Sequence, residues 1–185
     1  MKFSFVVTTR EAMSRCQTSY MRHLLLVCIS LSTGFVMSLE SDKNQRVLWS
    51  SDGDSTMSVE GNTRILGMTE NVKVTQGTLE ILGNEAIFEY TASTNELTRV
   101  TVRGTPVHYQ QQLDEDGSIV VGTSNTLLFY TDETTNETIL ELIGNADIQS
   151  PDSTMSCEAI IYIANRDLIR EATGPCEGTL STARD

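Results

Sequence analysis

The chain has 185 residues, of which 39% are hydrophobic and 21% charged, and its formal net charge at pH 7 is −12. This size and balance fit one globular domain that buries a core of its own. Four basic residues, Lys2, Arg10, Arg15 and Arg22, precede Leu39, and from there on 24 acidic side chains face 9 basic ones, a balance of about −15. Such a charge repels nucleic-acid phosphates, which excludes DNA and RNA as expected partners.

The N-terminal part resembles an export signal. Residues 24–31 (LLLVCISL) form an apolar run that follows Arg22 and precedes small and polar residues. A run this short spans a bilayer poorly as a helix, whereas basic, apolar and small-residue segments in this order are typical of a secretory signal peptide. We therefore expect residues 1–38 to be a signal peptide, with Met21 as an alternative start. A retained membrane anchor is the alternative, because residues 34–37 lengthen the apolar stretch.

The mature chain divides into an arm and a domain. Residues 39–57 are polar and rich in Ser and Asp, which favours a flexible N-terminal arm with at most one strand, around Val47 to Trp49. Over residues 58–182, β-branched and aromatic residues alternate with polar ones, as in Leu79-Glu80-Ile81, between clusters of Gly, Asn and Asp. No window repeats apolar residues with a helical period. We therefore predict an all-β domain over residues 58–182.

An internal repeat lies within this domain. Three segments end in a tyrosine and are followed by a polar turn: EAIFEY at Tyr90, NTLLFY at Tyr130 and CEAIIY at Tyr162. The strand after each turn is expected to end in a glycine: Gly104, Gly144 and Gly174. Such hairpins are too thin to bury a face alone, so they must wrap until their apolar sides share a core. This predicts an open, rolled antiparallel sheet, a β-jelly roll built from repeated hairpins, with end strands free to pair with a partner.

Strand alternation also predicts which side chains face the inside of the roll. They are mostly Val, Ile and Leu, a set that forms either a plain core or the lining of a groove for an apolar ligand. The predicted inward residues, which are our candidate ligand-binding residues, are Val72, Val74, Leu79, Ile81, Phe88, Tyr90, Val100, Val102, Val107, Tyr109, Ile119, Val121, Leu128, Tyr130, Leu140, Leu142, Ile148, Ile160 and Tyr162.

One stretch of the domain resembles a known family, the periplasmic lipopolysaccharide-transport proteins of the LptA (OstA-like) type. The similar residues are Gly67-Met68-Thr69-Glu70-Asn71-Val72-Lys73-Val74-Thr75-Gln76-Gly77, followed by Thr78-Leu79-Glu80-Ile81. Asn84-Glu85 stands where these proteins usually have an Ala-Asp pair, and Gly144-Asn145-Ala146-Asp147 repeats the Gly-Asn pattern. The similarity covers residues 58–182.

The resemblance implies a function as well as a fold. It implies a periplasmic carrier, not an enzyme, that holds the lipid A acyl chains of lipopolysaccharide in a hydrophobic β-groove and bridges inner- and outer-membrane transport components. The implied partners are inner-membrane LptC-like and outer-membrane LptD-like proteins and further copies of the chain, joined end to end by strand addition. An LptC-like role stays open, because LptC shares the fold. A structural or adhesive β-repeat without a lipid ligand is the alternative, and it predicts a filled interior.

Cysteine and histidine offer few further sites. Removal of the signal takes Cys16 and Cys28, leaving Cys157 and Cys176, which either pair in an oxidising compartment or stay as two free buried thiols. A disulfide would fasten the last hairpin. His108 is the only histidine after the signal and alternates outward, and no serine lies in a nucleophile motif. We expect no cofactor, no metal site and no catalytic residue.

Overall fold

The computed structural model of the protein describes residues 42, 44–113 and 117–181. All of them belong to the second of two compact units of the chain, Val36–Asp185. The expected signal peptide, residues 1–38, lies outside the described residues. No helix in the described part of the chain is long and apolar enough to cross a membrane.

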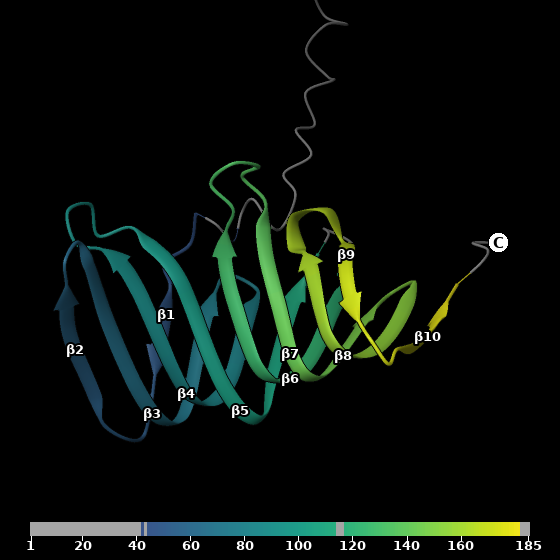
Figure 1. Ribbon diagram of the computed structural model, residues 1–185, viewed down its shortest axis with the longest axis horizontal. Coiled ribbons are helices and arrows are strands. Elements are labelled where there is room, and N and C mark those ends of the chain that lie inside the picture. The colour runs from purple at the N-terminus through teal and green to yellow at the C-terminus, as the bar shows by residue number, and fades with distance from the viewer. Residues whose placement is uncertain (1–41, 43, 114–116, 182–185) are drawn as a thin grey trace, which may run out of the picture. The chain divides into compact units, whose positions relative to one another are not determined.

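One antiparallel sheet accounts for nearly all of the described chain (Figure 1). Its elements are β1 (Leu48–Ser50), β2 (Ser55–Glu60), β3 (Thr63–Gln76), β4 (Leu79–Thr91), β5 (Leu97–Gln112), β6 (Ile119–Thr131), β7 (Thr138–Ser150), β8 (Ser153–Ile163), the 3-10 turn η1 (Ala164–Arg166), β9 (Leu168–Thr173) and β10 (Glu177–Leu180). The strands pair in the order β1-β3-β4-β5-β6-β7-β8-β10, while β2 also pairs with β3 and β9 with β8. The predicted all-β, rolled antiparallel sheet is confirmed.

The long strands bend near their middles, and the bends line up across the sheet. Shifts in the pairing register mark them: between Thr69 and Val72, Leu82 and Glu85, Arg103 and Val107, Thr123 and Thr126, and Ile143 and Ala146. A bulge bends a strand without ending its pairing. Figure 1 shows the sheet folding back along this line, which we call the crease. The hairpin turns at the strand ends away from the crease form the mouth of the roll.

Glycines at the crease correct one prediction. Gly104 and Gly144 were expected to end strands, but both lie inside continuous strands, β5 and β7, where the chain bends. Gly144 has a φ of +78°, which side-chain-bearing residues rarely adopt. A Cβ on Gly83 would lie 2.9 Å from the Arg103 carbonyl oxygen, so the close approach of β4 and β5 requires glycine there. Gly174 does follow the end of its strand, β9.

The crease divides the sheet into two halves whose inner faces pack on each other. The first half contains β2, β9 and residues 63–69, 85–91, 97–103, 126–131, 138–143 and 159–163. The second half contains β1, β10 and residues 72–76, 79–83, 107–112, 119–123, 146–150 and 153–157. One hydrophobic cluster joins the inner faces of both halves and includes Phe88 and Leu140 from the first and Ile81 and Tyr109 from the second.

The sheet begins earlier than residue 58, the expected start of the domain. β2 pairs with the first half of β3, and β1 with the second half. Every residue of both strands is exposed. β1 overlaps the one strand expected within the arm, around Val47 to Trp49, whereas β2 begins three residues before the expected start of the domain. Part of the segment expected to be a flexible arm is therefore an edge of the sheet.

Candidate functional site

The inner face of the roll is a continuous apolar surface formed by one hydrophobic cluster. It holds most of the predicted inward residues, and each of these has an exposed fraction of 3% or less: Val72, Val74, Leu79, Ile81, Phe88, Val100, Val102, Val107, Tyr109, Leu140, Leu142, Ile148, Ile160 and Tyr162. The faces are packed against each other, as the alternation of β3, β4, β5, β7 and β8 predicts.

On β6 the predicted inward set was wrong. Ile119 and Val121 are 47% and 37% exposed, and Val120 between them is buried. Leu128 and Tyr130 likewise lie on the outer side, while Leu127 is fully buried. Both runs, Ile-Val-Val and Leu-Leu-Phe, are apolar at every position. Alternation of apolar and polar residues therefore cannot tell which of their side chains point inward. The observed phase turns Gly122 inward, where an added Cβ would lie 3.2 Å from a methyl group of Leu142.

The three repeated tyrosines do not share one environment. Tyr162 is buried, and Tyr90 is half-buried at the edge of the core. Tyr130 lies on the outer side, where its hydroxyl donates to Glu141 at 2.6 Å and the Arg99 guanidinium stands 5.3 Å from its ring centre. The repeat in the sequence therefore reproduces the strands but not the direction of each side chain, because bulges shift the phase between repeats.

A buried polar cluster lies at the mouth of the roll. The Asp42 carboxylate, from the arm before β1, is 4% exposed. It accepts hydrogen bonds from the Thr78 backbone N–H at 2.9 Å, the Thr78 hydroxyl at 2.6 Å and Gln111 Nε2 at 3.0 Å. The Tyr109 hydroxyl donates to Gln111 Oε1 at 2.9 Å. A Cβ on Gly77 would overlap the Asp42 carboxylate. The absence of a side chain at this turn position therefore leaves space for Asp42.

Two buried tyrosines connect the two halves at this mouth. Burial raises the pKa of Tyr109, on the second half, and the nearby Asp167 and Asp42 carboxylates raise it further. Burial also raises the pKa of Tyr162, on the first half; the neighbouring Tyr109 adds to this, as does Asp167, which accepts the Tyr162 hydroxyl at 2.8 Å. Both phenols are therefore neutral hydrogen-bond donors at physiological pH.

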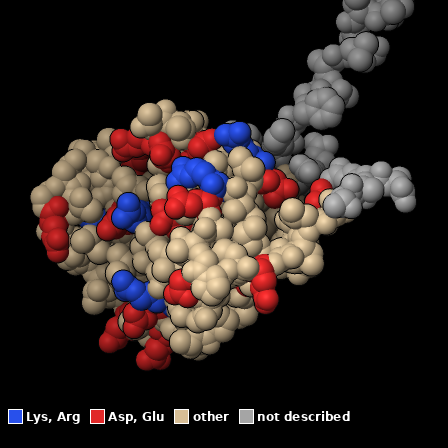
Figure 2. Space-filling model, turned by 45° about the vertical axis from the view of Figure 1, so that its right-hand side comes forward, with Lys and Arg blue, Asp and Glu red and all other residues tan. Residues whose placement is uncertain are grey.

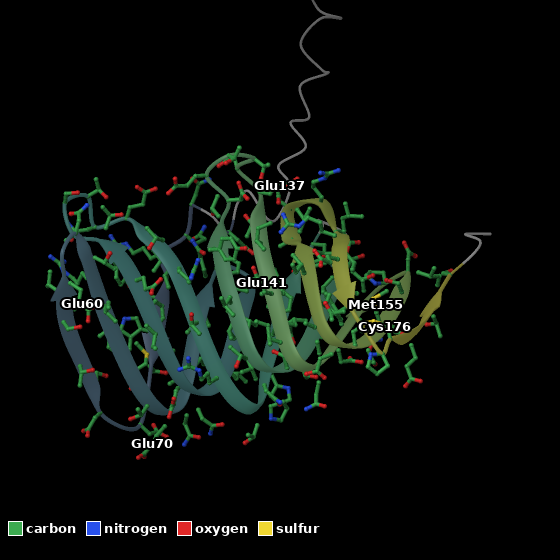
Figure 3. All side chains as sticks on the ribbon, viewed as in Figure 1. Glu60, Glu70, Glu137, Glu141, Met155 and Cys176 are labelled. Carbon is green, nitrogen blue, oxygen red and sulfur yellow. A yellow bond between two sulfur atoms is a disulfide. The ribbon has the colours of Figure 1, made fainter. Side chains whose placement is uncertain are left out.

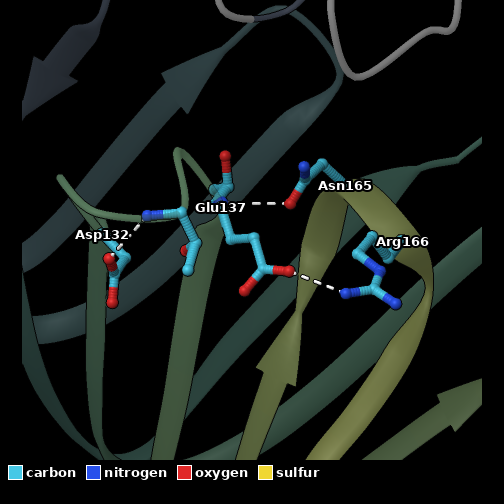
Figure 4. A network of polar contacts seen from close by, with 6 residues as sticks. Asp132, Glu137, Asn165 and Arg166 are labelled. Carbon is cyan, nitrogen blue, oxygen red and sulfur yellow. Dashed lines mark hydrogen bonds and ion pairs between the residues drawn. The ribbon is translucent and has the colours of Figure 1, made fainter.

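The first-half side of the mouth is held together by a separate network (Figure 4). The Thr138 N–H donates to Asn165 Oδ1 at 3.0 Å, and Arg166 pairs with Glu137 at 2.8 Å, which ties the β6–β7 loop to η1. Within the loop, the Asp132 carboxylate accepts the backbone N–H groups of residues 134 and 135, and these bonds lower its pKa. These short contacts join the β6–β7 loop to η1 on this side of the mouth. The arm contacts the mouth through the Asp42 side chain and through the Gln45 carbonyl oxygen, which accepts Gln76 Nε2 at 3.2 Å.

The outer face contains His108, the residue on which a catalytic site would have to be built. His108 is exposed beside a shallow hollow of about 450 Å³ whose lining includes Glu80, Leu82 and Val121. No group of three or more His, Cys, Asp or Glu side chains among the described residues is placed to hold a metal ion. On the face shown in Figure 2, basic and acidic side chains are interspersed and form no continuous basic area.

The sheet has open edges at both ends of its strand order. β1 and β2 form the N-terminal edge, and β9 and β10 the C-terminal edge. Large apolar side chains on these strands are exposed: Leu48, Trp49, Met57, Val59, Leu168 and Leu180. Exposed strands of this kind are templates for pairing with another chain.

A disulfide bond fastens the C-terminal edge. It joins Cys157 in β8 to Cys176 in the link between β9 and β10, and its Cα atoms are 4.3 Å apart. β8 pairs with β9 through residues 159–163 and with β10 through residues 153–156. The bond therefore lies where the edge passes from one strand to the next, near the crease (Figure 3).

Comparison with known proteins identifies the family. Residues 53–167, more than half of the chain, match the family described as LptA/(LptD N-terminal domain) LPS transport protein. The chain belongs to this family.

One sequence relative agrees with this assignment to the LptA/LptD N-terminal family, and one solved structure shares the fold. The lipopolysaccharide export system protein LptA of Haemophilus influenzae is 28% identical over 148 residues, which cover 80% of this chain and 81% of the relative. The crystal structure of LptH, the LptA-homologous periplasmic component of the lipopolysaccharide transport device of Pseudomonas aeruginosa, superposes with a TM-score of 0.59. It is 20% identical and covers 76% of this chain and 99% of its own, so this likeness shows the fold. The predicted resemblance is confirmed.

Within this LptA-family fold, sequence reasoning missed the polar mouth. Gln111 could have been found, because Val107, Tyr109 and Leu113 place every second residue of this segment inside. Asp42 could not, because its partners are 36 and 69 residues away in the sequence and no local pattern connects them.

Proposed function

We propose that this protein is a periplasmic carrier that holds the lipid A acyl chains of lipopolysaccharide between the two halves of its roll. The observation that carries the proposal is the continuous apolar inner face, bordered at the mouth by polar groups such as Gln111 and Asp167. An amphipathic ligand matches this division, with its chains inside and its headgroup outside. Membership of a lipopolysaccharide-transport family supports the same ligand.

Ligand binding requires the two halves to move apart, because their inner side chains are packed on each other. Acyl chains that enter cover the same side chains again and lose their own contact with water. The second effect is worth about 0.8 kcal/mol for each buried CH₂ group. The crease, where pairing is already interrupted in every long strand, is the natural hinge for this opening. The candidate ligand-binding residues are the inward side chains, with Val120 and Leu127 replacing the four outward residues of β6.

The carrier makes and breaks no covalent bonds. This is supported by the exposed position of His108, away from the apolar inner face. Transfer then depends on relative affinities along the route, and the energy for directional transport comes from another component.

The partners bind through the open edges. The N-terminal and C-terminal edges differ in sequence and lie at opposite ends of the strand order, so the contact between two copies is head-to-tail. An LptC-like inner-membrane protein would pair with one edge and an LptD-like outer-membrane protein with the other. The apolar side chains that are exposed on the edge strands support this mode of assembly.

Export to the periplasm fits the Cys157–Cys176 disulfide, because such bonds persist in oxidising compartments. In this proposal residues 1–38 are the signal peptide, and the lipid-binding domain comprises the sheet from β1 to β10.

Photocrosslinking tests the proposed ligand and its place. Leu140 is fully buried on the inner face, and its neighbour Glu141 lies on the outer side of the same strand. A benzoylphenylalanine at position 140 should crosslink to lipopolysaccharide in the periplasm, and one at position 141 should not. Equal crosslinking at both positions, or none at 140 in a protein whose circular dichroism is unchanged, would refute the proposal.

The tight packing of the interior favours a second candidate, a structural β-repeat without a ligand. That candidate predicts no lipid crosslink at position 140 and no change in the packing of the two halves when lipopolysaccharide is added.

A further inference from the structure

The polar cluster at the mouth has the properties of an oxyanion site that the chain fills with its own carboxylate. Three donors converge on Asp42: the N–H and hydroxyl of Thr78, at the β3–β4 turn, and the side-chain amide of Gln111, on the inner face of β5. They come from two different hairpins, and the sheet fixes their positions independently of the arm.

Gln111 is oriented by a contact that does not involve Asp42. Its Oε1 accepts the hydroxyl of Tyr109, which itself is buried. The remaining end of the amide, Nε2, is thereby presented to the mouth as a donor. Together with the two donors of Thr78, the site is therefore ready to receive an oxyanion when Asp42 leaves.

The donors that hold the Asp42 carboxylate can hold another oxyanion in its place. In the described part of the chain the donors to the Asp42 carboxylate are all neutral. A buried carboxylate gives up its hydration, and neutral hydrogen bonds offset that loss much less completely than a cation does. Release of Asp42 into water restores its hydration, and an entering oxyanion accepts the same three hydrogen bonds, which favour an oxyanion over a neutral oxygen.

The site also lies at the border between the mouth and the apolar interior, where the headgroup of a bound lipid would be. Gln111 is followed inward along β5 by Tyr109 and Val107, so the donors mark the boundary between the mouth and the apolar interior. A ligand whose acyl chains lie between the halves would place its first polar groups here.

We infer that Thr78 and Gln111 form a binding site for the anionic headgroup of the ligand, in particular a phosphate oxygen, and that Asp42 of the N-terminal arm competes for this site in cis. The inference rests on the proposed lipid-carrier function. It assigns the arm a role in setting ligand affinity, since the headgroup enters as the arm leaves.

Calorimetry with two amphiphiles tests the competition. The full chain, exported to the periplasm, is titrated with dodecyl phosphate and with the neutral dodecyl maltoside, both below their micelle concentrations. Asp42→Ala should tighten binding of dodecyl phosphate about tenfold and change binding of the maltoside much less. Asp54→Ala removes the same charge from an exposed position and should change neither affinity. Adding Gln111→Leu to Asp42→Ala should abolish the gain.

A second measurement separates this inference from the carrier function. Inorganic phosphate, which has no acyl chain, should shift the Thr78 amide resonance in the NMR spectrum of Asp42→Ala but not in that of the wild type or of Asp42→Ala/Gln111→Leu. No shift in Asp42→Ala, or an equal gain for both amphiphiles, would overturn the inference and leave the carrier proposal standing. Failure of every variant to bind either amphiphile would instead contradict the carrier proposal, while the phosphate shift would still report on the site.

Discussion

At the scale of single residues, Leu127 and Leu128 are adjacent on β6 and have opposite environments. Leu127 is fully buried, and Leu128 lies on the outer side. Leu127→Ala should lower the free energy of unfolding by about 2–5 kcal/mol, because it removes buried contacts and leaves a cavity. Leu128→Ala should cost less than about 1 kcal/mol. Urea denaturation of both variants measures the difference, and equal losses would contradict the strand phase.

The two buried tyrosines give a second prediction at this scale. The pKa values of Tyr109 and Tyr162 are raised above the ordinary value of 10.0. The folded state then binds protons that the unfolded state releases, so their contribution to stability is complete below pH 10 and is lost as the pH rises above it. The free energy of unfolding should fall between pH 10 and pH 11, and the double variant Tyr109→Phe/Tyr162→Phe should show a smaller fall. A slope that is the same in both proteins would contradict the assignment.

At the scale of elements, we expect the stability of the C-terminal edge to depend on the disulfide more than the stability of the central strands does. Replacing both Cys157 and Cys176 by Ser should cost about 3 kcal/mol, the value expected for closing a loop of this length. Hydrogen exchange should quicken first in β10, whose pairing is confined to residues 153–156 of β8. Exchange in β4 and β5, in the centre of the sheet, should change only through the overall loss of stability. A uniform rise across all strands would contradict this.

The strands themselves were largely predictable from the sequence, but their bends were not. Alternation such as that of Val100 and Val102 locates a strand because it depends on neighbouring residues. A bend depends on where the bulges of adjacent strands align, which is a property of the whole sheet. Gly104 and Gly144 were visible signals of a break in the pattern, and only the pairing register shows that the strand continues beyond them.

At the scale of the whole molecule, the open edges predict assembly. Val59, on the edge strand β2, and Ile143, at the crease of the central strand β7, are both exposed. Val59→Lys should weaken self-association at least about tenfold, because a charge on an edge strand opposes the addition of another strand. Ile143→Lys adds the same charge away from the edge and should leave association unchanged. Sedimentation velocity over a range of concentrations measures both, and equal effects would argue against strand addition.

In the candidate site too, features set by neighbouring residues were predictable, and contacts between residues far apart in the sequence were not. Most of the inner face followed from the alternation of each strand, and the error on β6 arose where three consecutive apolar residues concealed the phase. The polar mouth depends on Asp42 meeting Thr78 and Gln111, residues that only the closed roll brings together. The sequence alone therefore predicts most residues of the inner face but not the polar cluster at the mouth.

Native mass spectrometry with lipopolysaccharide tests the central claim most directly. The exported protein should form a saturable adduct, which Phe88→Asp, on the inner face, should abolish and Leu128→Asp, on the outer face, should preserve, with circular dichroism confirming that each variant is folded. No adduct from the folded wild-type protein, or an equal adduct from a folded Phe88→Asp variant, would contradict the carrier account.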